Sequence, residues 1–159
     1  MDIFYGLEPR WWGWDRYYRF MVTNRWVAGA WVAGQFFDRR SMEQQLGLLV
    51  ELLPFWVRSL ENKRWRQEET ASRIDPATEA FLRLDHRNFR EDLTGLKEVV
   101  LNRHSSMYSA CKDLGSVCLF FRQKKRRILL FEQSPDAVGS LFEKRGVPVR
   151  QEDKPSLIC

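Results

Sequence analysis

Residues 117–131, VCLFFRQKKRRILLF, place four consecutive cations between two short runs that are almost wholly apolar. Such runs, rich in Val, Ile and Phe and separated by a polar turn, favour the two strands of a β-hairpin. Apolar residues on both faces of each run indicate strands that are covered on both sides. We therefore expect a basic hairpin tip that prefers phosphate or carboxylate groups. Its candidate anion-binding residues are Arg122, Lys124, Lys125, Arg126 and Arg127.

The residues after the hairpin predict a short helix. Ser134 followed by Pro135 is typical of a helix start, and Gly146 is typical of a helix end. Residues 147–149 then predict an edge strand, where Pro148 is tolerated. We therefore expect a small hairpin-plus-helix unit over residues 116–149 and a polar tail over residues 150–159.

An aromatic and apolar segment occupies residues 17–37, YYRFMVTNRWVAGAWVAGQFF. Its longest uncharged stretch, residues 26–37, is shorter than the roughly 20 apolar residues that a membrane-spanning helix needs. Trp and Tyr on one flank and Arg39 with Arg40 on the other are nevertheless arranged as interfacial anchors are. We expect either a buried helix or strand pair, or a short tilted or interfacial membrane helix. This segment would end an aromatic and basic N-terminal extension over residues 1–40.

The tryptophan content is unusual, because seven Trp in 159 residues exceed what one small core easily covers. Trp, Tyr and Arg are enriched at the energetic centres of protein interfaces, and Trp and Tyr also at membrane surfaces. The alternative is that most of these rings fill the core. The candidate interface residues are Trp11, Trp12, Trp14, Tyr17, Tyr18, Trp26, Trp31 and Trp65.

The middle of the chain, residues 41–115, is expected to be helical. Ser41 and Gln44 match a capping box, and the apolar stripe that follows keeps its helical phase across Pro54. A kinked helix, or two helices meeting at this proline, is therefore predicted. Residues 58–66 surround Trp65 with cations, which indicates either a second basic and aromatic surface or a solvated helix end.

Residues 68–74 predict a polar connection, and Asp75 followed by Pro76 predicts a further helix start. Residues 81–103 fit either a helix or strands. The fold class that this order favours is α+β in a single domain over residues 1–159. An N-terminal helical part would be followed by the small C-terminal hairpin and helix.

The sequence contains no recognisable catalytic or metal-binding constellation. His86 and His104 lie among Arg, Asn or Ser residues, without a Cys or carboxylate at triad or metal-site spacing. Cys111, Cys118 and Cys159 are an odd count without CxxC spacing, which fits a reducing compartment. The first residues do not resemble a secretory signal. We expect an intracellular protein that is not an enzyme and uses neither a metal nor a cofactor.

The net charge of +5 and the pI of about 9.3 favour anionic partners. The leading hypothesis is a non-catalytic accessory subunit of a larger, membrane-associated complex, for example in a mitochondrial or other organellar membrane. Its partners would be other protein subunits and anionic lipid. A second hypothesis is a nucleic-acid-binding protein, ribosomal or winged-helix-like, that uses residues 122–127. In a third, strands within residues 81–103 join the hairpin and final helix in a PH-like module whose basic loop binds lipid headgroups.

Overall fold

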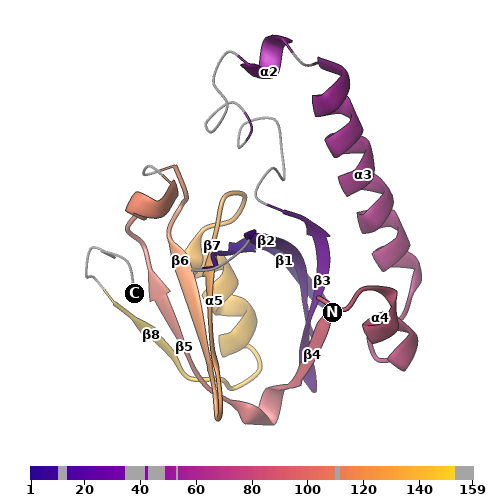
Figure 1. The fold of residues 1–159 in the computed structure, drawn as a ribbon. Coiled ribbons are helices and arrows are strands. Elements are labelled where there is room, and N and C mark those ends of the chain that lie inside the picture. The colour runs from indigo at the N-terminus through magenta and orange to yellow at the C-terminus, as the bar shows by residue number, and fades with distance from the viewer. Residues whose placement is uncertain (11–13, 35–41, 43–48, 53, 110–111, 153–159) are drawn as a thin grey trace.

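A computed structural model of the chain describes residues 1–10, 14–34, 42, 49–52, 54–109 and 112–152. Its main feature is one sheet of eight strands in the order β4-β3-β2-β1-β7-β6-β5-β8 (Figure 1). All neighbours pair antiparallel except β5 and β8, which are parallel. The strands are β1 (Asp2–Glu8), β2 (Arg16–Val22), β3 (Trp26–Ala33), β4 (Phe89–Asp92), β5 (Leu96–Asn102), β6 (Ser116–Phe121), β7 (Lys125–Leu129) and β8 (Val149–Gln151).

Helices occur in the middle of the chain and near its end. Between β3 and β4 the described residues form α2 (Leu49–Leu52), α3 (Pro54–Arg73) and α4 (Glu79–Leu84), and α5 (Pro135–Glu143) follows β7. Short 3₁₀ turns, η1 (Leu93–Gly95) and η2 (Met107–Ser109), flank β5. In Figure 1, α3 runs alongside β3, and its first turns project with α2 beyond the end of the strands. Helix α5 instead packs against β5 and β6.

The expected N-terminal helical part is wrong, because strands dominate the N-terminus. Within the segment 17–37, the described residues form strands β2 and β3 and not a membrane or interfacial helix. Thr23 closes the turn between the two strands, where its hydroxyl oxygen accepts a hydrogen bond from the Trp26 backbone N at 3.1 Å. In the described part of the chain, no helix combines the length and apolar character that crossing a bilayer requires.

The N-terminal strands misled the prediction because they are covered on both faces. On one face, the rings of Phe4 and Phe20 stack with centroids 4.6 Å apart, and Phe142 of α5 meets Phe4 edge-on at 6.3 Å. On the other face, Met21 is buried in a second cluster with residues of α3 and α4, among them Phe81. A strand that is apolar on both faces lacks the alternation that distinguishes strand from helix in sequence.

The C-terminal elements agree better with the sequence. Strands β6 and β7 form the expected hairpin. Ser134 caps α5 by accepting a hydrogen bond from Ala137 N at 3.2 Å, and Gly146 follows the helix with a φ of +73°. Two helices meet near Pro54, as one alternative predicted, whereas Ser41 lies outside the described residues.

Two expectations for the middle of the chain need correction. Residues 68–73 belong to α3 and are not a polar connection. Residues 41–115 are not simply helical, because β4 and β5 lie within them. Residues 81–103 were expected to form either a helix or strands, and the structure shows mainly strands. Helix α4 occupies only the start of this range. Both strands join the same sheet as the hairpin.

Candidate functional site: a cationic cavity and the basic face of helix α3

Helix α3 contacts the sheet through residues at helical spacing. Ala71 near its end is buried with Met21 and Ala28 of the sheet, whereas Val57 near its start is buried in a separate cluster with Met42 and Leu60. Between them the contacts are polar, and Arg64 pairs with Glu132 at 3.4 Å while its guanidinium lies 5.0 Å from the centre of the Tyr17 ring. Long polar side chains therefore hold the middle of α3 against the sheet, instead of close apolar packing.

A tyrosine on β1 helps to fix the rotation of α3. The hydroxyl of Tyr5 donates a hydrogen bond to Glu68, and burial together with this bond raises the pKa of Tyr5 from 10.0 to about 12. Further along, Arg19 on β2 donates to the hydroxyl oxygen of Ser72. These bonds determine which side chains of α3 face the sheet and which face outward.

A cavity of about 560 Å³ lies between α3 and the ends of β2 and β3. This volume is within the range of roughly 300 to 1,000 Å³ that is typical of small-molecule sites. Four of the described lining residues are cations and one is a carboxylate. The lining residues are Trp14, Asp15, Arg16, Trp31, Val32, Ala33, Gly34, Leu60, Lys63, Arg64, Gln67 and Arg87.

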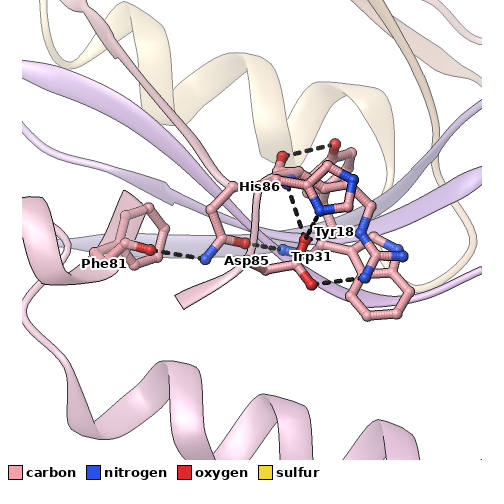
Figure 2. Close-up of polar contacts among 7 residues, drawn as sticks. Tyr18, Trp31, Phe81, Asp85 and His86 are labelled. Atoms are coloured by element: carbon pink, nitrogen blue, oxygen red, sulfur yellow. Dashed lines mark hydrogen bonds and ion pairs between the residues drawn. The ribbon is translucent and has the colours of Figure 1, made fainter. Parts of the chain in front are cut away.

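The loop between α4 and β4 brings Arg87 to this cavity. Figure 2 shows the polar contacts of this loop around Asp85 and Trp31. Arg87 donates to both carboxylate oxygens of Asp85 at 2.7 and 2.6 Å, which lowers the pKa of Asp85. The guanidinium carbon also lies 3.1 Å from the centre of the Trp31 ring. Asn88 holds the loop, accepting from Trp31 N at 2.8 Å and donating to the Phe81 carbonyl oxygen at 2.9 Å. The guanidinium of Arg87 and the ring of Trp31 are thus held next to each other.

The carboxylate of the cavity, Asp15, already has hydrogen-bond donors. It is buried, and both its oxygens accept from the Tyr108 hydroxyl at 2.7 Å, while one also accepts from Arg10 N at 3.0 Å. Burial and the bond to Asp15 raise the pKa of Tyr108. Arg16 and Lys63, in contrast, form no ion pair with any described residue. The cavity therefore retains positive charge.

The outward side of α3 carries a second basic surface. Phe55, Arg58, Ser59, Asn62, Lys63, Arg66 and Gln67 line a hollow of about 500 Å³. We call these seven residues the basic face of α3, and none of them is a carboxylate.

Large apolar side chains are exposed around this face. Phe55 is 85% exposed, Leu52 on α2 is 72% exposed and Trp65 is 64% exposed. They belong to the α2–α3 region whose start projects beyond the strands in Figure 1. Exposed Trp, Phe and Leu beside Arg and Lys are typical of surfaces that enter the headgroup region of a bilayer.

The cations of the hairpin tip contact the fold to different extents. Lys124 forms an ion pair with Glu91, and Lys125 lies 5.1 Å from the centre of the Phe120 ring. Arg122 is exposed and Arg127 is half-buried.

The fifth of these cations, Arg126, is largely buried. It pairs with Glu8 at 2.9 Å and stacks 3.6 Å above the Phe89 ring. Its side chain is 14% exposed and that of Glu8 is 13% exposed. Lys125, Arg126 and Arg127 belong to strand β7, so only Arg122 and Lys124 of the five lie in the turn itself. Part of the positive charge expected at the tip is therefore paired within the described structure.

The candidate interface residues divide into three groups. Tyr17 and Tyr18 are fully buried, so they belong to the interior of the fold. Trp26 and Trp31 are half-buried and pack against apolar clusters. Trp14 is 71% exposed and Trp65 is also exposed. Trp11 and Trp12 lie outside the described residues.

No family model, curated protein or solved structure matches this chain. Among the described residues, no group of three or more His, Cys, Asp or Glu side chains could hold a metal ion.

The sequence analysis did not single out Arg16, Arg87 or Asn88. Because the cavity combines residues from β2, β3, α3 and the loop before β4, no local spacing could reveal it. The cations around Trp65 were the one local signal for the basic face of α3.

Proposed function

We propose that this protein is a non-catalytic accessory protein that attaches to an anionic membrane surface through the basic face of α3. The observation that carries the proposal is the position of Phe55, which is exposed at the start of α3 and lines the same hollow as Arg58, Lys63 and Arg66, with no carboxylate among the described lining residues. The aromatic ring would enter the headgroup region while the cations contact lipid phosphates.

The charge arrangement favours a lipid surface as the partner of this face. Each Lys or Arg near an anionic membrane contributes about 1 kcal/mol of attraction, and several act together. A protein interface would more commonly deplete lysine at its centre, whereas Lys63 lies inside this hollow. Attachment of this kind is consistent with an accessory role beside membrane-bound protein subunits.

A non-catalytic role is supported by the contacts of the groups whose pKa values are most strongly raised. Strongly shifted pKa values are a marker of catalytic residues when no structural contact explains them. Here Tyr5 is hydrogen-bonded to Glu68, and Tyr108 to Asp15, so packing of the fold accounts for the shifts.

The nucleic-acid alternative receives less support from the hairpin tip. Lys124 and Arg126 are already paired with carboxylates, so binding phosphate there would require the two ion pairs to be broken. The PH-like alternative shares with our proposal the binding of anionic lipid. It differs in placing the contact at the hairpin tip and not on α3.

Vesicle sedimentation tests the proposal. The protein should bind phosphatidylcholine vesicles that contain phosphatidylserine, bind vesicles of phosphatidylcholine alone more weakly, and lose binding as salt is raised. The double variant Arg58→Gln/Arg66→Gln should bind about 30-fold more weakly, from about 1 kcal/mol for each cation.

The matched control is Lys97→Gln/Lys112→Gln, which removes two exposed cations outside the basic face. Equal losses in the two double variants would contradict a specific role for α3 and indicate a response to net charge. Loss of binding on substitution of Lys124 and Lys125 alone would favour the PH-like contact. Tight, salt-dependent binding of RNA with no vesicle binding would favour the nucleic-acid hypothesis instead.

A further inference from the structure

We infer that the cavity between α3 and the ends of β2 and β3 is a binding site for a single amphiphilic anion: a small molecule with an anionic headgroup and an apolar chain. This site lies on the sheet side of α3. It shares Lys63 and Gln67 with the basic face of α3, and its other described lining residues do not belong to that face. The inference does not depend on the proposed membrane attachment.

The cationic part of the cavity would hold the headgroup. Arg16 comes from the start of β2 and Lys63 from α3, and neither is paired with a described carboxylate. The oxygens of Asp15 accept hydrogen bonds from the Tyr108 hydroxyl and the backbone N of Arg10, so they bond to neutral donors and not to these two cations. An anionic headgroup between Arg16 and Lys63 would form the charge-assisted hydrogen bonds that this arrangement leaves available.

The apolar part of the cavity would hold the chain. Trp14 and Trp31 contribute aromatic surface, and Leu60 contributes aliphatic surface from α3. Arg87 lies against the Trp31 ring and is held there by both carboxylate oxygens of Asp85, so this wall is fixed before any ligand binds. A preformed wall reduces the entropy lost on binding.

The presence of cations and aromatic surface in one cavity distinguishes the expected ligand from simpler ones. A free inorganic anion would leave the surface of Trp14 and Trp31 in contact with water. A neutral apolar molecule would leave Arg16 and Lys63 without an anionic partner. Only a ligand with both parts uses the whole lining, whether it is released from a lipid or arises as a soluble metabolite.

Calorimetric titration with single-chain probes below their micelle concentration tests this inference without a membrane. Dodecyl phosphate and laurate should bind, whereas inorganic phosphate and dodecyl maltoside should bind at least about tenfold more weakly, since each lacks one of the two parts. Two variants separate the two parts of the site. Arg16→Gln should weaken the binding of dodecyl phosphate by about tenfold and leave the binding of dodecyl maltoside unchanged. Trp14→Ala should weaken the binding of both compounds.

Two control variants test whether the binding is specific to the cavity. Lys97→Gln, which removes an exposed cation that does not line the cavity, should bind dodecyl phosphate as the wild type does. Phe55→Gln should also retain this binding, so failure of membrane attachment and failure of the cavity are distinguishable. Trp14 is 71% exposed, so Trp14→Ala keeps the test available if Arg16→Gln does not fold.

Three results would overturn the inference. They are equal affinity for dodecyl maltoside and dodecyl phosphate, affinity for inorganic phosphate equal to that for dodecyl phosphate, and unchanged dodecyl phosphate binding in both cavity variants.

Discussion

Substitution of Phe55 by glutamine is the sharpest test of the membrane-binding surface. The ring is 85% exposed, so almost its whole area is available to enter a bilayer. Complete burial of a phenylalanine side chain contributes about 1.5 to 3 kcal/mol. Replacing the ring with a polar side chain that retains helix propensity should therefore weaken vesicle binding by about 2 kcal/mol, or about 30-fold.

The assay is a titration of protein with vesicles that contain phosphatidylserine, together with thermal unfolding of each variant. The melting temperature of Phe55→Gln should stay near that of the wild type, because the exposed ring is not part of the core. The matched control is Met107→Gln on η2, which removes another exposed apolar side chain, 67% exposed, outside the basic face. This variant should bind vesicles like the wild type.

Three outcomes would contradict the reasoning. Wild-type binding by Phe55→Gln would show that the ring does not enter the bilayer. An equal loss in Met107→Gln would show that binding responds to overall surface hydrophobicity and not to α3. A large fall in the melting temperature of Phe55→Gln would instead contradict the exposed position of the ring.

Three further predictions concern the fold, and chemical denaturation tests each. Asn88→Ala should lower the free energy of unfolding by about 2 kcal/mol, because the Trp31 backbone N–H loses its acceptor; an unchanged value would argue against this bond. Glu8→Ala should lower the free energy of unfolding by about 3 kcal/mol, because Arg126 is left largely buried without its carboxylate partner. Adding Arg126→Met to this variant should restore much of the lost free energy of unfolding. Burial and its bond to α3 raise the pKa of Tyr5 from 10.0 to about 12, so its contribution to stability is complete below pH 10 and lost as pH rises through 12. Tyr5→Phe should therefore reduce the fall in stability over this interval, and an identical fall in both proteins would contradict the assignment.

The hairpin and the final helix were predictable because their signals are local. The cap at Ser134 and the positive φ of Gly146 depend on a few neighbouring residues, so sequence patterns capture them. For residues 17–37 the sequence offered a strand pair as one alternative, which β2 and β3 confirm, but it did not decide between strands and a helix. Residues 17–33 are apolar on both faces because α3 and α4 cover the face opposite the main core, and this cover comes from a distant part of the chain.

The candidate site likewise combines features that the local sequence indicated with features that only the fold creates. Trp65 and its neighbouring cations lie in one helix, so the sequence already indicated a basic and aromatic surface there. For the cavity, Trp14 and Trp31 stood out as aromatic residues and Arg16 follows closely after Trp14, but nothing local joined this pair to Trp31 or Arg87. Antiparallel pairing of β2 with β3 and the hydrogen bonds of Asn88 bring these side chains to one wall.

The sequence by itself determined the hairpin, the cap of α5 and the excess of positive charge, and it left a kinked helix or two helices open near Pro54. The tertiary structure alone decided which charges are paired. Arg126 is adjacent to Lys125 in sequence, yet Arg126 is largely buried against Glu8 from β1, whereas the side chain of Lys125 is exposed and lies 5.1 Å from the centre of the Phe120 ring. The physical reason is that the alternating faces of β7 direct one side chain toward Glu8 and the next away from it, and only the folded sheet brings Glu8 to that position.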